Sequence, residues 1–151
     1  MRRQDREIAE REGIDEILTA NSVCHLAMVD DGRPYVVPMT YGYDGRCIYL
    51  HSATAGRKVE ALRRDGRVCF SIFDGFHPPG ADLACRKSTK YRSVIGTGTV
   101  TFLEGEDKVA ALDMLMRQVY GVGRQDFPPQ KLENVLALRI DIDTLTGKCS
   151  R

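Results

Sequence analysis

The chain has 151 residues, a length that suits one domain with a buried core and is short for two. Its 42% hydrophobic and 28% charged residues are typical of a folded globular protein and exclude a disordered or fibrous chain. Lysines and arginines number 22 and aspartates and glutamates 21, so the net charge of +1 argues against a protein that coats nucleic acid with uncompensated cations.

The N-terminal segment, residues 1–21, is predicted to be helical because apolar residues recur along one side of it. This thin stripe consists of Ile8, Ile14, Ile17 and Leu18. Alternating apolar residues and turn signals then predict three strands, over residues 23–29, 34–43 and 47–52. Pro38 lies inside the second of these strands, which predicts a bulge, an edge, or a place where something other than a strand meets the backbone.

After the third strand the pattern changes to a short helix over residues 54–62, which Ser52 or Thr54 could cap. A fourth strand is predicted over residues 67–73. Residues 74–90 show no regular pattern, and loops of that length in compact domains are usually functional or mobile.

The C-terminal part is predicted to hold a long strand over residues 91–103, an amphipathic helix over 106–120 and a last strand over 136–142. The long strand contains Gly96 and Gly98, which predict curvature or close packing. Six strands, connected mostly by hairpins, indicate a mainly β fold, either an antiparallel barrel or a strongly curled sheet. A doubly wound α/β domain would alternate helices and strands throughout, and this chain does not.

A phosphate-binding pattern stands where the third strand ends. Ser52 offers a hydroxyl, and Gly56, Arg57 and Lys58 follow at the start of the predicted helix. Cations are unfavourable at a helix N-terminus unless an anion is bound there. Free backbone N–H groups, a hydroxyl and two cations together suit a phosphate dianion. The alternative is a solvated basic helix face that happens to begin at Gly56.

Two other patterns are weaker. Ser93, near the start of the long strand, is a candidate for a hydrogen bond to a ligand. The run Gly96-Thr97-Gly98 lacks the third glycine of a dinucleotide-binding motif and is followed by strand rather than helix, so that motif is excluded.

Cysteines and histidines alternate along the chain and raise the question of a metal site. They are Cys24, His25, Cys47, His51, Cys69, His77 and Cys85. On one strand Cys47 and His51 would lie about 13 Å apart at ~3.3 Å per residue, which is too far to hold one ion. No metal is therefore predicted. Most of the five cysteines are expected to be core residues, while Cys85 lies beside cations that could lower its pKa.

Neither a membrane nor the secretory route is indicated. No apolar run approaches the roughly 20 residues that span a bilayer. The first dozen residues mix basic and acidic side chains without the apolar stretch of a signal peptide. The irregular cysteine spacing fits reduced thiols. We therefore expect a single domain over residues 1–151, located in the cytoplasm, with no membrane or nucleic-acid partner.

Several short motifs keep their order and spacing from about His25 to Lys148. They are His25-Leu26-Ala27, Gly32-Arg33-Pro34-Tyr35-Val36-Val37-Pro38-Met39, Ile48-Tyr49-Leu50-His51-Ser52-Ala53, Gly56-Arg57-Lys58, Tyr91-Arg92-Ser93-Val94-Ile95-Gly96-Thr97-Gly98 and Thr146-Gly147-Lys148. This succession resembles the pyridoxamine 5′-phosphate oxidase-like flavoproteins, and within them the nitroimidazole-resistance branch. The resemblance implies an FMN-binding split β-barrel that forms a homodimer with the cofactor at the subunit interface.

The resemblance also assigns roles to residues. Ser52, Arg57 and Lys58 match the positions that bind the FMN phosphate, in agreement with the pattern described above. The positions that match contacts to the isoalloxazine or the ribityl chain are Val37, Pro38, Met39, Thr40, His51 and Ser93. The arginines with which the oxidases bind pyridoxal phosphate, and their C-terminal segment, have no counterpart here, so oxidation of pyridoxamine phosphate is not implied.

The function expected on these grounds is that of an FMN-dependent oxidoreductase that reduces a small-molecule substrate such as a nitro-aromatic or a quinone. No catalytic residue is assigned. The alternative is a protein that binds flavin or haem without turnover, for storage or sensing, with His25, His51 or His77 as an axial ligand to haem. Acceptor-dependent turnover would distinguish the two.

Overall fold

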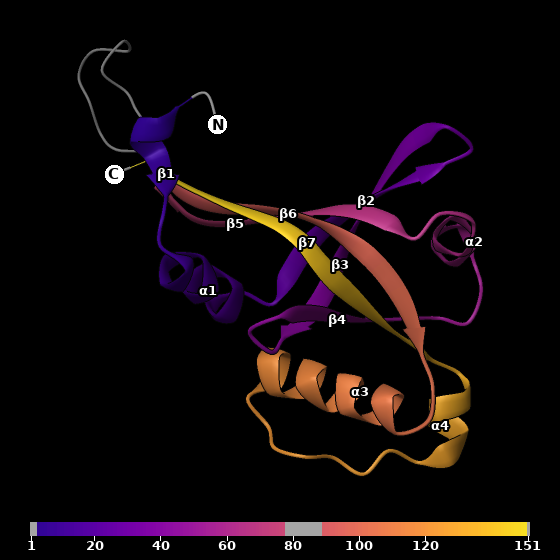
Figure 1. Ribbon diagram of the computed structural model, residues 1–151. Helices are drawn as coiled ribbons and strands as arrows, with labels where there is room; N and C mark the ends of the chain where they lie inside the picture. Colours follow the sequence, from indigo (N-terminus) through magenta and orange to yellow (C-terminus); the bar gives the residue numbers. More distant parts are fainter. Residues whose placement is uncertain (1–2, 78–88, 151) are drawn as a thin grey trace.

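The computed structural model describes residues 3–77 and 89–150, which form one antiparallel sheet curled into a barrel (Figure 1). The seven strands are β1 (Glu7–Ile8), β2 (Val23–Asp30), β3 (Arg33–Tyr43), β4 (Cys47–Ser52), β5 (Arg67–His77), β6 (Lys90–Leu103) and β7 (Leu136–Ser150). Their order is β1-β7-β4-β3-β2-β5-β6, and β6 also pairs with β7, which closes the ring. The mainly β, barrel-like fold is confirmed.

Four helices and one 3-10 turn accompany the sheet. They are the turn η1 (Gln4–Arg6), α1 (Arg11–Ala20), α2 (Arg57–Arg64), α3 (Gly105–Tyr120) and α4 (Pro129–Glu133). Figure 1 shows α3 lying across one side of the sheet and α2 at the end of the sheet away from β1. Among the described residues, no helix is long and apolar enough to cross a membrane.

The N-terminal segment differs from the single helix predicted for residues 1–21. Glu7 and Ile8 form a short strand opposite Lys148 and Gly147, and the helix begins only at Arg11. Ile8 therefore belongs to the sheet, whereas Ile14, Ile17 and Leu18 are buried by α1 in the barrel core. A pairing with a strand at the other end of the chain overrides the local helical pattern.

Two strands run further than predicted. β7 continues past Ile142 to Ser150 because β6 pairs with it along almost its whole length. β5 continues to His77, into the segment predicted as a loop over 74–90. The rest of that loop, with Cys85, lies outside the described residues.

The long strand β6 is curved around two close contacts that only glycine permits. A Cβ atom on Gly96 would overlap the ring of the fully buried Phe70, and one on Gly98 would overlap the backbone oxygen of Asp141. The register of β6 against β7 also shifts between Thr97 and Gly98. Close packing at both glycines is confirmed.

Helix α3 covers the outer face of the sheet where β3, β4 and β7 meet. Its backbone lies directly on Gly42, where an added Cβ would come within 2.8 Å of the Met114 carbonyl. A second, smaller core forms between α3 and the sheet from Leu103, Ala111, Leu112, Leu115 and Ala137. Gln118 of α3 also donates hydrogen bonds to the Leu18 and Asn21 carbonyls, which fixes the C-terminal end of α1.

Candidate functional site

The barrel opens between β3 and β4. These strands pair only where Tyr41–Tyr43 meets Ile48–Leu50. Beyond that point β4 follows β7 as far as Ser52, whereas the first part of β3, residues 33–40, pairs with β2. Within the described residues, no strand covers the other edge of this part of β3. Its outward backbone groups are therefore available to a ligand.

Only alternate residues of β3 present their backbone groups to this open edge. The Tyr41 N–H donates to the Ser22 carbonyl at 3.0 Å, so the odd-numbered residues of β3 point their N–H and C=O groups toward β2. Val37 and Met39 are thus engaged with the neighbouring strand. Pro38 and Thr40 face the open edge, with Pro38 offering only its carbonyl. Pro38 pairs with His25 without a register shift, so it marks an edge and not a bulge.

The start of α2 carries free backbone donors but no side-chain cap. The helix begins at Arg57, and its N-cap is Gly56 with φ +119°. Neither Ser52 nor Thr54 caps it, so that prediction is wrong, because the helix starts three residues later than the pattern suggested. Glu60 N–H is the first to bond within the helix, to Gly56. The N–H groups before it are left for water or an anion.

Arg57 is already paired. Its Nε donates to Asp30 at 2.7 Å, and its guanidinium lies 4.1 Å from the centre of the Tyr35 ring. Arg64 pairs with both Asp30 and Asp31. These contacts hold α2 against the hairpin of β2 and β3, with Arg57 of its first turn over the ring of Tyr35, a residue of the strand whose edge is open. The charge of Arg57 is largely compensated, and its role is mainly to position α2.

Lys58, in contrast, has no hydrogen-bond or ion-pair partner within residues 3–77 and 89–150. Its side chain is half-buried, and this burial lowers the pKa of its ammonium group. Partial burial and the charge of Lys58 together lower the pKa of His51. Ser52 lies between them in the chain and is 6% exposed. An uncompensated cation beside free helix N–H groups is an arrangement that an anion would stabilise.

Thr40 and His51 come together at a cavity of about 160 Å³ between the sheet and α3. The remaining walls are mostly apolar and come from α3 and the segment after it: Leu112, Leu115, Met116, Val119, Tyr120 and Phe127. The sequence predicted the helix and its apolar side but not what that side covers, because no local pattern links residue 40 or 51 to residue 116.

Ser93 lies apart from the other predicted site residues. It stands opposite Phe73 and Lys148, and Lys148 in turn pairs with β1. Ser93 is therefore at the β1 end of the sheet, whereas α2 lies at the other end (Figure 1). One chain does not bring Ser93 together with Lys58.

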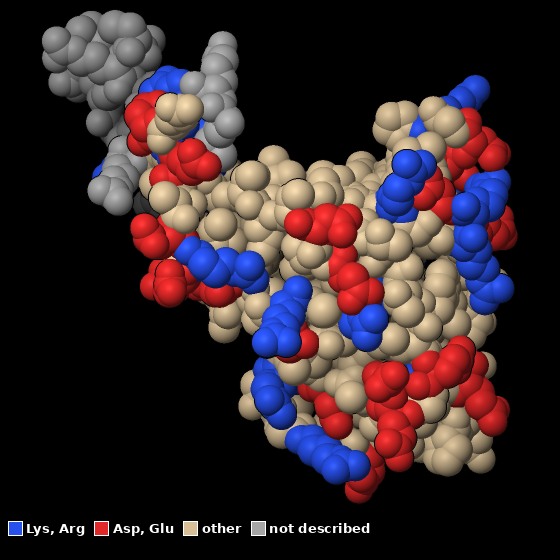
Figure 2. Space-filling view, viewed as in Figure 1, with Lys and Arg blue, Asp and Glu red and all other residues tan. Residues whose placement is uncertain are grey.

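The outer face of β3, β2, β5 and β6 carries apolar side chains that are exposed among the described residues. One row of paired neighbours crosses these four strands and consists of Pro38, His25, Ser71 and Ile95. Large apolar side chains on this face are about half exposed: Val29, Val36, Phe73 and Ile95. Figure 2 shows few charged side chains along the upper margin of the sheet, between the N-terminal end of the chain and the hairpin of β2 and β3. Contiguous exposed apolar surface of this kind marks an interaction site.

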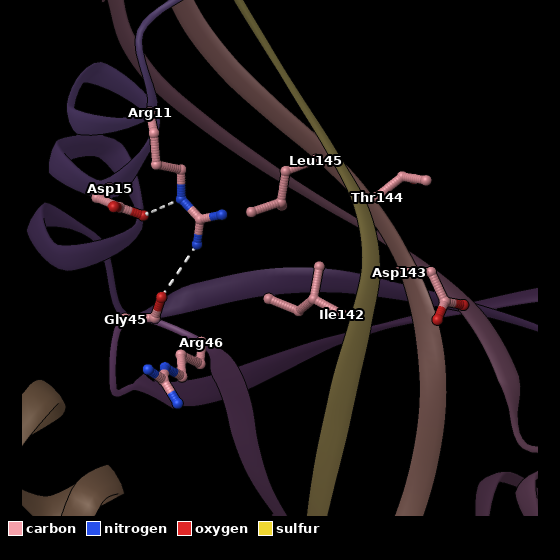
Figure 3. Close-up of a pocket in the computed structure, with 8 residues that line it drawn as sticks. All are labelled: Arg11, Asp15, Gly45, Arg46, Ile142, Asp143, Thr144 and Leu145. Atoms are coloured by element: carbon pink, nitrogen blue, oxygen red, sulfur yellow. Dashed lines mark hydrogen bonds and ion pairs between the residues drawn. The ribbon is translucent and has the colours of Figure 1, made fainter.

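A second cavity, of about 430 Å³, lies between α1 and the turn after β3 (Figure 3). Arg11 donates to Asp15 at 2.8 Å and to the Gly45 carbonyl at 3.0 Å. The Tyr43 hydroxyl also donates to Asp15, and burial together with this bond raises the pKa of Tyr43 to about 12. These polar groups satisfy one another and anchor α1, and no predicted site residue lines this cavity.

The cysteines do not form a reactive or metal-binding cluster in the part of the chain that the structure describes. Cys24 is buried, and burial raises the pKa of its thiol to about 12. Cys47, Cys69 and Cys149 are partly buried. Among the described residues no three His, Cys, Asp or Glu side chains are grouped to hold an ion. Cys85 and the side chain of His77 lie outside the described part.

Comparison with known proteins shows which proteins this chain is similar to. A candidate 5-nitroimidazole antibiotic resistance protein from Bacteroides thetaiotaomicron is 32% identical, with a TM-score of 0.85 over 95% of this chain and 86% of the other. The FAD and heme binding protein from Mycobacterium smegmatis has the same fold at 24% identity, with a TM-score of 0.85 over 97% and 74% of the two chains. An uncharacterized protein, RA0666, from Rhizobium meliloti is 29% identical over 95% of this chain and 94% of its own length.

The family described as pyridoxamine 5′-phosphate oxidase matches residues 10–149, nearly the whole chain. This agrees with the barrel and with the order of motifs in the sequence. The chain belongs to the pyridoxamine 5′-phosphate oxidase-like family.

Proposed function

We propose that this protein is an FMN-dependent oxidoreductase that reduces a small electrophilic molecule, such as a nitro-aromatic or a quinone. The observation that carries the proposal is Lys58, a half-buried cation without a partner in the described residues, at the free N-terminal turn of α2. Arg57 of the same turn lies over the ring of Tyr35 on β3, the strand with the open edge. Support also comes from the family, and from similar folds in proteins described as binding FAD and heme.

The residues at the start of α2 fit the phosphate of FMN. Lys58 supplies an ammonium group, the first turn supplies backbone N–H groups, and Ser52 supplies a hydroxyl. Each charge-assisted hydrogen bond contributes ~1.5–3 kcal/mol. Two or three of them provide much of the ~8 kcal/mol that a micromolar affinity requires. Arg57 would add long-range attraction while remaining paired with Asp30.

The open edge of β3 fits the polar edge of a flavin ring. The pyrimidine part of the ring presents carbonyl acceptors on both sides of an N–H donor. Pro38 offers a carbonyl acceptor and Thr40 an N–H donor on the open edge, so both kinds of bond can form. Val37 and Met39 would contribute indirectly, because their backbone groups pair with β2 and hold β3 in place. His51 and Thr40 would lie at the boundary between the ring and the cavity under α3.

The chemistry itself would come from the flavin, which transfers hydride between a donor and an acceptor when it is bound. The residues of this chain bind and orient the reactants and exclude water. Partial burial and the charge of Lys58 lower the pKa of His51 and so favour its neutral form. A neutral imidazole can donate one hydrogen bond and accept another without adding charge.

We also propose that the protein is a homodimer with FMN at the interface. Two facts support a second copy on the outer face of β3, β2, β5 and β6. The face is apolar, and Ser93, the remaining predicted contact, lies at the opposite end of the sheet from Lys58. Two copies packed with their sheets antiparallel would bring Ser93 of one copy toward the open edge of the other.

The first test is the visible absorption spectrum of the purified protein before and after addition of FMN and desalting. Two broad bands, one in the blue and one in the near ultraviolet, that survive desalting would support the proposal. Anaerobic reoxidation of the reduced protein by an acceptor, faster than that of free FMN, would support turnover. A sharp Soret band would point to haem instead, and a protein that retains no flavin would contradict the proposal.

Ile95, a half-exposed residue on β6 at one side of this apolar face, tests the dimer. Ile95→Glu places a charge on that face and is expected to convert a dimer into a monomer, with loss of FMN retention, because a buried unpaired charge costs several kcal/mol. Light scattering after gel filtration measures the mass. Ala110→Glu, at an exposed position of α3, is the matched control and should remain dimeric. A monomeric wild-type protein that binds FMN would contradict this part of the proposal.

A further inference from the structure

One edge of β7 has an unpaired stretch. β6 occupies the other edge along almost its whole length, so β4 and β1 share this one. β4 pairs with β7 only as far as Asp141, and β1 pairs with it only from Gly147. Residues 142–146 therefore have no strand beside them on this edge within the described part of the chain. The cavity of about 430 Å³ between α1 and the turn after β3 lies against this stretch, because residues 142–145 line it.

Leu145 presents a backbone donor and a backbone acceptor to this cavity. The Val100 N–H donates to the Gly66 carbonyl at 2.8 Å, so odd-numbered residues of β6 direct their backbone groups toward β7. Ile95 thus bonds to its partner Thr146, and the N–H and C=O groups of Leu145 point to the unpaired edge. Neither group has a backbone partner there among the residues that the structure describes.

Two arginines lie beside this backbone. Arg11 of α1 uses its Nε and Nη2 atoms in the bonds that anchor the helix, whereas Nη1 has no partner in residues 3–77 and 89–150. Figure 3 shows the Arg11 guanidinium reaching from α1 toward Leu145. The backbone N–H of Arg46 bonds to Asp44, but its side chain has no hydrogen bond or ion pair within the same ranges. Guanidinium donors are therefore available to an anion in the cavity.

The other lining residues leave room for an anion with a hydrocarbon part. Asp15 already accepts two hydrogen bonds on Oδ1, which partly compensates its charge. Asp143 points to the other side of β7 in Figure 3, whereas Ile142 and Leu145 point toward the cavity. These two side chains are partly buried against the barrel core. They provide an apolar floor next to the polar groups.

We infer that this cavity binds a small N-acylated amino acid, which is a carboxylate with an amide N–H one carbon away and an apolar side chain. In an antiparallel pair of residues, each N–H bonds to the carbonyl of the other. The amide N–H of the ligand donates to the Leu145 carbonyl in this manner, and its carboxylate accepts from the Leu145 N–H. Arg11 and Arg46 bind the same carboxylate, because guanidinium groups match carboxylates in charge and shape. The apolar side chain lies on Ile142.

The strands at both ends of the unpaired stretch limit the length of the ligand. Residues 142–146 span about 16 Å at ~3.3 Å per residue. An extended peptide added along this edge would meet β4 at one end and β1 at the other. The site therefore suits a small molecule and not an added strand from another protein.

This site is separate from the start of α2 and from the face proposed for a second copy. Its lining residues belong to α1, to the turn after β3 and to β7. The inference therefore does not depend on flavin binding. A protein that retains no FMN would contradict the proposed function and still allow this site to be tested.

The binding test uses N-acetyl-L-leucine as the probe and ¹H–¹⁵N NMR of the purified protein as the readout. The Leu145 amide signal is expected to shift in a saturable way, while that of Ile140, which pairs with Ile48 inside the sheet, stays in place. N-acetyl-L-leucinamide lacks the charge and 4-methylpentanoate lacks the amide, so each should bind about tenfold more weakly or worse. A Leu145 signal that does not respond, or equal binding of the three compounds, would overturn the inference.

Arg46→Gln removes one guanidinium group at an exposed position, where the substitution leaves the fold intact. It is expected to weaken N-acetyl-L-leucine binding about tenfold and to leave the binding of N-acetyl-L-leucinamide unchanged, since that compound has no carboxylate. Arg124→Gln makes the same change at an exposed position after α3 and is the matched control. Equal affinity of Arg46→Gln and the wild type for N-acetyl-L-leucine would contradict the assignment of the carboxylate site.

Discussion

Lys58→Met is expected to weaken FMN binding by about 10- to 100-fold, which corresponds to the loss of one charge-assisted hydrogen bond of ~1.5–3 kcal/mol. Lys58 is the cation at this helix start that has no partner among the described residues. Methionine keeps the length of the side chain and removes the charge. The measurement is a titration of FMN fluorescence with the protein.

Riboflavin provides the control because it lacks the phosphate. Its affinity should be the same for Lys58→Met and the wild type if Lys58 binds the phosphate. Arg57→Ala alone should have a smaller effect on FMN binding than Lys58→Met, since Arg57 is already paired with Asp30. The double variant Arg57→Ala/Lys58→Ala should lose a few kcal/mol. Wild-type FMN affinity in the double variant would contradict the phosphate assignment.

The same lysine links stability to pH. Burial lowers the pKa of Lys58 in the folded chain, so the folded state releases its proton more readily than the unfolded state. The free-energy cost of burying the charged ammonium group is fully present at neutral pH. It decreases as pH rises from the pKa of Lys58 in the folded chain toward its pKa in the unfolded chain. Lys58→Met removes it, so the flavin-free variant should melt at the same temperature as the wild type or higher. A lower melting temperature would indicate a structural role instead.

Gly96→Ala is expected to reduce the free energy of unfolding by about 3 kcal/mol. The added methyl group would overlap the ring of Phe70, which is fully buried. Denaturant unfolding followed by circular dichroism measures the change. Gly123→Ala, at a position with open space around the Cβ, is the control and should change stability little.

A double variant separates this overlap from a general loss of strand flexibility. Phe70→Leu shortens the buried side chain and should lessen the cost of Gly96→Ala, with a coupling energy of at least ~1 kcal/mol between the two sites. Additive effects of the two substitutions would mean that Phe70 is not the cause.

The predicted parts of the fold are those in which neighbouring residues carry the information. β4 begins at Cys47 and ends at Ser52 as predicted, because alternation and the turn at Asp44-Gly45 define it locally. The second half of β7 contains Asp143, Thr144 and Gly147, which give no strand pattern by themselves. It is extended because β6 and β1 pair with it, and such pairing cannot be seen in one segment.

The candidate site also has features that neighbouring residues predict and features that depend on distant segments. The position of Lys58 at a helix start follows from the local sequence, whereas Pro38 left a bulge and an edge open until the pairing of β3 with β2 was known. The pairing of Arg57 with Asp30, and the cavity that His51 and Met116 line together, join segments that are distant in the chain. The acidic residue at the end of β2, Asp30, was the only available signal for the first of these. Nothing in the sequence signals the second.

The open edge of β3 has a consequence for how this protein avoids association with other chains. An uncovered strand edge can template the addition of a foreign strand and so lead to aggregation. Pro34 and Pro38 both face this edge and both lack an N–H group, which leaves Val36 and Thr40 as its donors. These donors lie about 13 Å apart at ~3.3 Å per residue. A continuous ladder with another strand cannot form there, whereas a compact ring can still find one donor and one carbonyl side by side.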